Sequence, residues 1–165
     1  MKKKYEFLDL ATVDAPYISD IEEAVSRVIR SGRYIGGAEC DALEARLASL
    51  TGSTFAIGVS NGLDALRLIL HAYVRLGVMA PGDEIIVPAN TYIASVLAIS
   101  DAGLTPVLVN PDPLTSNLDT AAVLRAIGPR TRGVMPVHLY GRVCWDENLL
   151  AMARDMNLKI IEDNA

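Results

Sequence analysis

Apolar residues recur with a helical period in the first third of the chain. Between residues 16 and 31 they stand three or four positions apart, at Ile18, Ile21, Val25, Val28 and Ile29. Gly32 follows this run, and a glycine commonly ends a helix. A second helical run covers residues 39–50 and stops before Thr51 and Gly52. The pattern therefore predicts an N-terminal helical segment over residues 1–52.

After residue 52 the pattern changes to short apolar runs that alternate with helical stretches. Five runs predict strands, at residues 55–59, 84–87, 106–109, 133–137 and 158–161. Helices are predicted between them, at residues 63–76, 91–102, 119–127 and 146–156. The strand runs are apolar throughout, as in a parallel sheet that is covered on both faces. The predicted fold class is α/β, with residues 53–165 forming a mostly parallel sheet flanked by helices.

Charge and hydropathy narrow the range of partners. The net charge is -5, and basic residues form only short clusters, so nucleic acid is not an expected partner. No apolar stretch is long enough to span a bilayer, and Glu6 and Asp9 interrupt the segment where a secretory signal needs apolar residues. We therefore expect a cytoplasmic protein with no membrane partner.

Cysteine and histidine give few signals. Cys40 and Cys144 lie far apart without a CxxC or Cys/His cluster, so neither a disulfide framework nor a metal site is expected. His71 shares a polar helix face with arginines and is expected to be solvated. His138 follows the strand predicted at residues 133–137, where it could orient the strand-end loop or contact a ligand.

Polar residues follow two of the predicted strands, at the edge where open α/β folds bind ligands. Asn61 and Gly62 stand between the first strand and its helix, so the free N–H groups of the first helical turn form an anion site. An ordinary Ser/Asn helix cap has the same pattern. Tyr92 begins the next helix, where it could lie flat against a planar ligand or pack into the interior.

Asp163 follows the last predicted strand and has no basic residue near it in the sequence. A buried carboxylate is costly unless a cation or hydrogen-bond donors meet it. A protonated ring nitrogen would be such a partner. The alternative is an acid at the strand end that water solvates.

Five stretches in this order resemble one family. They are Ser60–Leu66, Pro81–Pro88, Thr91–Tyr92, Pro136–Gly141 and Glu162–Ala165. They are similar to the DegT/DnrJ/EryC1/StrS sugar aminotransferases, which use pyridoxal 5'-phosphate (PLP). The resemblance implies the N-terminal part of the large domain of a fold-type I PLP-dependent transferase. Residues 88–95 look most like the enzymes of deoxyamino-sugar biosynthesis that aminate C3 of a dTDP-linked 3-oxo-6-deoxyhexose.

The resemblance also implies a cofactor site. Backbone N–H groups of Gly62 and Leu63 would hold the PLP phosphate, with Asn61 able to add a side-chain hydrogen bond. Tyr92 would stack on the pyridine ring and Asp163 would pair with its nitrogen. A protonated ring is the electron sink of this chemistry. The implied partners are a nucleotide-linked keto-sugar, an amino donor and further copies of the chain in a homo-oligomer.

The resemblance covers less than half of a family enzyme, so the last strands, the small domain and the Schiff-base lysine are expected beyond Ala165. Lys159 would lie roughly 13 Å from Asp163, toward the wrong end of the same strand. We therefore expect no catalytic residue in this chain and no turnover by it alone. The run at 55–59 is also expected to lack its strand neighbours, which would lead to an oligomer, a rearranged sheet or local disorder.

Other functions are weighed against an aminotransferase. A non-catalytic chain with a binding or assembly role stays open, as does part of a PLP-dependent sugar dehydratase, in which histidine replaces the lysine. Residues beyond Ala165 would decide between these functions. A Rossmann-type nucleotide domain is disfavoured because no GxGxxG follows a predicted strand, and Gly36 and Gly37 lie between two predicted helices.

Overall fold

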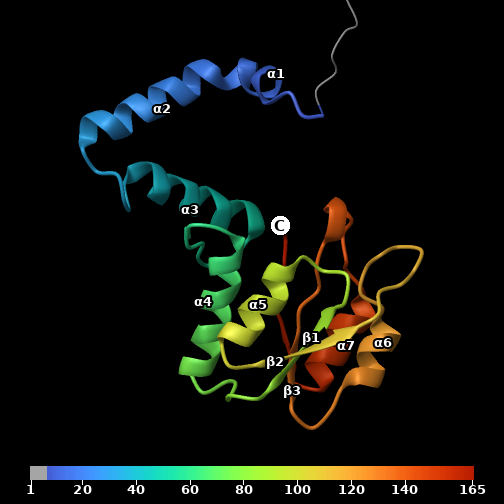
Figure 1. Cartoon of the computed structure of the whole chain (residues 1–165). Coiled ribbons are helices and arrows are strands. Elements are labelled where there is room, and N and C mark those ends of the chain that lie inside the picture. The colour runs from blue at the N-terminus through green and yellow to red at the C-terminus, as the bar shows by residue number, and fades with distance from the viewer. Residues whose placement is uncertain (1–6) are drawn as a thin grey trace, which may run out of the picture. The chain divides into compact units, whose positions relative to one another are not determined.

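The computed structural model describes residues 7–165 and divides the chain into two compact units (Figure 1). Unit 1 extends to Gly58, and unit 2 comprises Val59–Ala165. The domain boundary expected between residues 52 and 53 stays a prediction.

The regular elements in the described part of unit 1 are helices. Its elements are α1 (Leu10–Asp14), the 3-10 turn η1 (Ala15–Tyr17), α2 (Ile18–Ser31) and α3 (Ala38–Thr51). Asp9 caps α1 by accepting a hydrogen bond from the backbone N–H of Thr12 at 3.1 Å. Gly32 and Gly52 end α2 and α3 in the left-handed conformation that the sequence pattern indicates. The two helices predicted in this segment are confirmed.

Residues 55–59 do not form the predicted first strand, so that prediction is wrong. The backbone of this run uses side-chain partners: Gly58 N donates to Glu44 Oε1 at 2.6 Å, and Phe55 O accepts from Ser53 Oγ at 3.0 Å. Phe55 and Ile57 are each 80% exposed. An apolar pattern makes a strand only where another strand completes the hydrogen-bond ladder. The expectation that this run lacks strand neighbours is confirmed for the described part of the chain.

Unit 2 is built on a four-stranded sheet in the order β2-β1-β3-β4. The strands are β1 (Glu84–Pro88), β2 (Thr105–Val109), β3 (Thr131–Val134) and β4 (Lys159–Ile160). All three pairings are parallel. The carboxyl ends of the strands therefore meet at one edge of the sheet. The predicted parallel α/β fold is confirmed, with strand bounds that differ from the prediction by a few residues.

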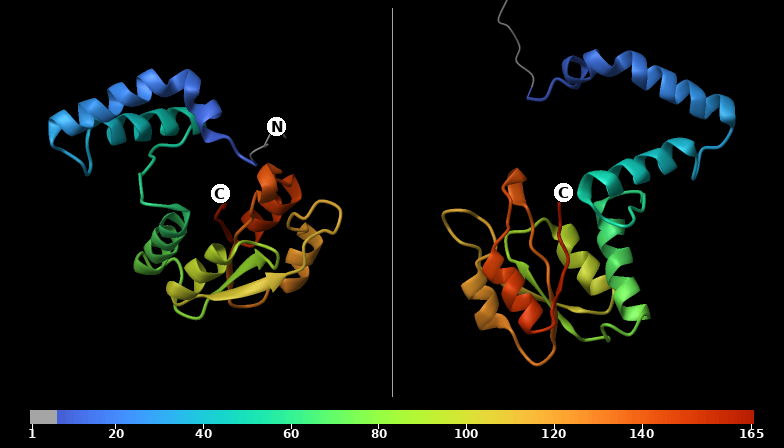
Figure 2. Two further views of the ribbon diagram at one scale, coloured as in Figure 1. Left: turned by 45° about the horizontal axis from the view of Figure 1, so that its top comes forward. Right: turned by 180° about the vertical axis from the view of Figure 1, so that it is seen from behind.

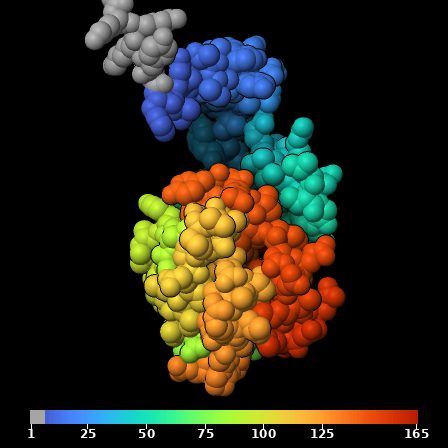
Figure 3. Space-filling model, turned by 90° about the vertical axis from the view of Figure 1, so that its right-hand side faces the viewer, coloured from blue at the N-terminus to red at the C-terminus, as the bar shows by residue number. Residues whose placement is uncertain are grey.

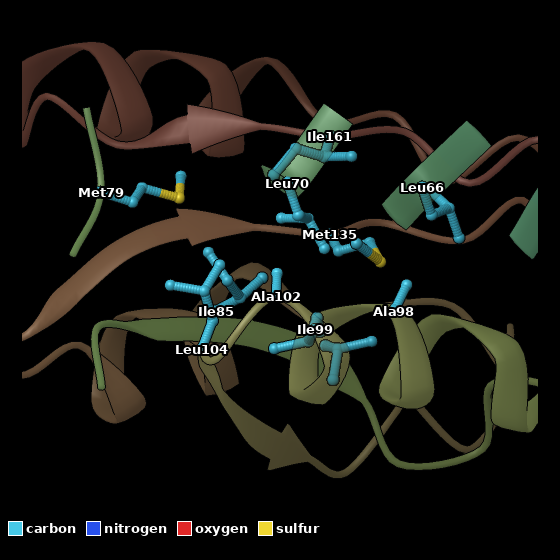
Figure 4. Close-up of a cluster of buried hydrophobic side chains, with 11 residues drawn as sticks. Leu66, Leu70, Met79, Ile85, Ala98, Ile99, Ala102, Leu104, Met135 and Ile161 are labelled. Carbon is cyan, nitrogen blue, oxygen red and sulfur yellow. The ribbon is translucent and has the colours of Figure 1, made fainter. Parts of the chain in front are cut away.

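Helices cover both faces of this sheet (Figure 2). One layer contains α4 (Gly62–Arg75) and α5 (Ile93–Asp101); the other contains α6 (Thr120–Ala126) and α7 (Glu147–Asp155), and the turn η2 (Leu139–Gly141) follows β3. Ile85 and Val87 pack in the cluster under α4 and α5 (Figure 4), whereas Ile86 packs in the cluster under α6 and α7. Figure 3 shows the outer face of the α6–α7 side. Successive side chains of β1 thus enter the two cores in turn, which explains why the strands are apolar throughout.

Chemically special residues are few in this fold. Cys40 and Cys144 are both free thiols. Among residues 7–165, no helix combines the length and the apolar character needed to cross a membrane. The same residues contain no cluster of three or more His, Cys, Asp or Glu side chains arranged to hold a metal ion.

Gly133 allows β3 to lie tightly between its neighbours. A Cβ added there would stand 3.0 Å from both Ile85 Cδ1 and the backbone O of Lys159. Gly133→Ala should therefore lower the free energy of unfolding by about 1–3 kcal/mol, the usual cost of overpacking. Urea denaturation followed by the fluorescence of Trp145, the chain's single tryptophan, measures this change. Gly128→Ala is the control, because its Cβ would meet Glu84 Oε2 at 3.6 Å; equal losses in the two variants would contradict the steric argument.

Asp146 links the starts of α6 and α7. It accepts hydrogen bonds from Thr120 Oγ1 at 2.5 Å and from Asn148 N at 2.9 Å, and these bonds lower the pKa of Asp146 below 3.8. Because the pKa is lower in the folded state, the Asp146 carboxylate stabilises the fold at pH values above its pKa in the unfolded chain. This contribution disappears as pH falls through the pKa in the folded state. The stability difference between wild type and Asp146→Asn should therefore shrink below about pH 3.8. Urea denaturation between pH 6 and pH 2 tests this, roughly spanning the carboxyl range; a constant difference would contradict it, and Asp155→Asn is the exposed control.

Candidate functional site

The site begins where β3 and β4 continue to pair beyond their regular ends. Asp163 N donates to Pro136 O at 2.9 Å, and Asp163 O accepts from His138 N at 3.1 Å. These bonds form an isolated parallel bridge between Val137 and Asp163. The Asp163 side chain thus stands at the carboxyl edge of the sheet, where the residue is only 7% exposed. The alternative of a solvated strand-end acid is therefore wrong.

Among residues 7–165, only neutral donors form hydrogen bonds with the Asp163 carboxylate. Ser95 Oγ donates to Oδ2 at 2.7 Å, and the backbone N–H of Ala165 donates to Oδ1 at 3.2 Å. No Lys, Arg or His side chain among residues 7–165 forms an ion pair with it. A buried carboxylate without a cation is incompletely compensated. The arrangement suits a ligand that brings a cationic donor.

The start of α4 lies beside this strand end. Asn61 caps the helix: its Oδ1 accepts from Asp64 N at 3.0 Å and its Nδ2 donates to the Asp64 carboxylate at 3.2 Å. The helix-cap interpretation therefore holds for the Asn61 side chain. The N–H groups of Gly62 and Leu63 precede the first intrahelical hydrogen bond, and within the described residues they have no partner. A Cβ on Gly62 would lie 4.0 Å from Ala165 Cβ, so anion-binding N–H groups and the Asp163 strand end are neighbours.

Tyr92 stands at the beginning of α5, directly after the loop that leaves β1. It is the N-cap residue in an extended conformation, and it is 75% exposed. Its carbonyl accepts from Ser95 N at 3.2 Å, which connects it to the helix turn that holds Asp163. Packing into the interior is therefore excluded for Tyr92. The ring is free to lie against a ligand, and stacking itself stays a prediction.

Ser95 is the site residue that sequence reasoning missed. It is fully buried, and its hydroxyl lies 2.7 Å from Thr91 Oγ1 as well as 2.7 Å from Asp163. One sequence signal could have indicated it. Ser95 follows Thr91 by four positions, which in the helix predicted over residues 91–102 would put both hydroxyls on one face.

His138 holds the loop that follows β3. Its Nδ1 accepts from the backbone N–H of Cys144 at 2.8 Å, and its Nε2 lies 3.1 Å from Glu162 Oε2. Because Nδ1 accepts, the neutral ring carries its proton on Nε2 and donates it to Glu162. Both nitrogens have protein partners, which favours the loop-orienting role over ligand contact. Cys144 is buried, and burial raises the pKa of its thiol, so it is an unreactive cysteine.

Removing the His138 ring should weaken this loop. His138→Ala leaves the N–H of Cys144 without its acceptor, so we expect the free energy of unfolding to fall by about 1–3 kcal/mol. Trp145 fluorescence in urea measures the change. The matched control is His71→Ala on the exposed side of α4, which should alter stability by less than about 0.5 kcal/mol. Equal effects at the two histidines would show that the His138 contacts contribute nothing.

Comparison with known proteins identifies the family of this chain. Residues 17–165 match the DegT/DnrJ/EryC1/StrS aminotransferase family. The chain is 50% identical over 159 residues to the dTDP-3-amino-3,6-dideoxy-alpha-D-galactopyranose transaminase of Aneurinibacillus thermoaerophilus. This alignment covers 96% of this chain and 43% of that protein. It is 44% identical to the dTDP-3-amino-3,4,6-trideoxy-alpha-D-glucose transaminase of Streptomyces venezuelae, over 96% of this chain and 41% of the relative.

A solved structure of similar fold also matches the chain. The crystal structure of S. venezuelae DesV in complex with a ketimine intermediate matches 98% of this chain and 43% of its own, with a TM-score of 0.89 and 42% identity. The chain thus spans less than half the length of the relatives it matches. It belongs to the DegT/DnrJ/EryC1/StrS aminotransferase family.

Proposed function

We propose that this chain forms the cofactor-binding part of a PLP-dependent aminotransferase that acts on a keto-sugar nucleotide of the dTDP-3-oxo-6-deoxyhexose type. The observation on which this rests is the buried carboxylate of Asp163, which has two neutral donors and no cation. The protonated ring nitrogen of PLP is a planar cationic donor, and it would complete this environment.

The other parts of PLP also match residues of the site. The N–H groups of Gly62 and Leu63 at the start of α4 suit the phosphate, because a helix N-terminus attracts anions. The exposed ring of Tyr92 supplies a face for the pyridine. The Asn61 side chain supports this site indirectly, by capping the helix. The three recognition groups come from three loops at one edge of the sheet.

In this proposal each residue has a physical task. Asp163 holds a proton at the ring nitrogen, α4 binds the phosphate, and Tyr92 sets the plane of the ring. When bound, PLP supplies the electron sink that an amino-group transfer requires. Lys159 begins β4, at the opposite end of that strand from Asp163, so it is poorly placed to react with a ligand. We infer that a full-length form supplies the reactive lysine.

The substrate class is inferred from the relatives. The two transaminases named above act on dTDP-linked amino sugars, as their names state. A nucleotide-linked keto-sugar and an amino donor are therefore the partners we propose for the full-length protein. We also propose a homo-oligomer, for which the exposed apolar positions on α2 and α3 offer a surface, among them Ile21, Val25, Leu43 and Leu47.

Titration of the purified chain with PLP tests the cofactor assignment. We expect saturable binding, seen as a change in PLP absorbance and in protein fluorescence. Asp163→Asn keeps the size of the side chain but removes its charge, so it should weaken binding by about tenfold or more. Asp155→Asn, an exposed change on α7, should leave the affinity unchanged.

Two results would contradict the proposal. Equal PLP affinity in wild type and Asp163→Asn would reject the pairing of Asp163 with the ring nitrogen. Treatment of the PLP-saturated chain with borohydride should leave no cofactor attached, and stable attachment to Lys159 would show that the reactive lysine lies within this chain.

A further inference from the structure

Two hydroxyl groups stand in line behind the Asp163 carboxylate. Thr91 Oγ1 lies 2.7 Å from Ser95 Oγ, and Ser95 Oγ lies 2.7 Å from Asp163 Oδ2. Ser95 is fully buried, so its hydroxyl reaches neither solvent nor a ligand. The shortest contact of this hydroxyl with a site residue is the one to Asp163, so we expect Ser95 to influence the site mainly through that carboxylate.

The direction of these hydrogen bonds follows from proton counting. A serine hydroxyl has one proton, and an ionised carboxylate can only accept. Ser95 therefore donates to Asp163 and accepts from Thr91, which makes the chain run from Thr91 to Ser95 to Asp163. The competing acceptor for the Ser95 proton, the carbonyl of Tyr92, is farther away at 3.3 Å.

These contacts fix the plane of the carboxylate. Ser95 in α5 holds Oδ2, while the backbone N–H of Ala165 holds Oδ1 from the other side at 3.2 Å. A carboxylate accepts about four hydrogen bonds and two are made here, so room remains for a further donor from a ligand. Thr91 directly precedes Tyr92, the N-cap residue of α5, and Ser95 lies in the first turn of that helix, so both hydroxyls are close in sequence to the exposed Tyr92 ring.

We propose that Thr91 and Ser95 are positioning residues that orient the Asp163 carboxylate and thereby set the affinity of this chain for a protonated ring nitrogen. The inference rests on the proposed PLP function, and it adds two residues that do not touch the cofactor. It also explains why a hydroxyl occupies a fully buried position of α5.

The test compares PLP with 1-deazapyridoxal 5'-phosphate, in which a C–H group replaces the ring nitrogen. Ser95→Ala should weaken PLP binding by about tenfold, within the range expected for coupled neighbours, and change binding of the deaza compound by less than about twofold. Thr91→Val, which keeps the shape of the side chain, should cause a smaller loss with the same selectivity, and Thr91→Ser should restore binding. Ser100→Ala, exposed on the same helix, should change neither affinity.

The outcomes separate this inference from the proposed function. If Ser95→Ala weakens both ligands equally, or neither, the positioning role is overturned, because damage to the fold would not distinguish ring nitrogen from C–H. If wild type binds neither ligand, or binds both equally, the proposed function itself fails.

A double-mutant cycle of unfolding measurements then tests the Ser95–Asp163 hydrogen bond without any ligand. Ser95→Ala, Asp163→Ala and the double variant are compared in urea. If the unfolding constant of the double variant differs by at least about threefold from the product of the two single effects, the Ser95–Asp163 interaction is supported. If it equals that product, the interaction is overturned.

Discussion

Parallel pairing of the strand ends beyond β3 and β4 is the interaction on which the site depends. The hydrogen bonds that join Pro136, His138 and Asp163 continue the ladder past the last regular residues. Ile161, two residues earlier, packs in the core under α4 and α5. The apolar part of the strand therefore anchors in the core, and its direction delivers a carboxylate to a buried place. Without this pairing, no strand contact would hold Asp163 in that place.

The edge of the sheet combines recognition groups for opposite charges. The first N–H groups of α4 favour an anion, and the Asp163 carboxylate favours a cation. Asp64, the acid next to the anion site, has a cationic partner: the Arg67 guanidinium lies 3.6 Å from its carboxylate. The same guanidinium lies 2.7 Å from the carboxylate of Asp101. A planar ligand with a phosphate at one side and a protonated nitrogen at another satisfies both groups. This charge pattern is more specific than the α/β fold, which many unrelated functions share.

Side chains that never touch the ligand stabilise this geometry. His138 fixes the loop after β3 through Cys144 and Glu162, and Ser95 holds the carboxylate from behind. Both act on residues adjacent to Asp163 or on Asp163 itself. Precise placement of a charged group requires such support, because a side chain with free rotation loses orientation and affinity.

The local elements, and the sheet edge at which the ligand groups gather, could be read from the amino-acid pattern alone. Helical periods, glycine stops and apolar runs depend on neighbouring residues, so α2, α3 and the parallel sheet could be predicted, together with Asp163 at a strand end. Other features depend on contacts that form only when the chain folds. Residues 55–59 have a strand pattern, but a strand needs a partner, and none of the described strands pairs with this run. Ser95 gained its role from a contact across 68 positions, and a local pattern contains no information about a partner that only folding brings near.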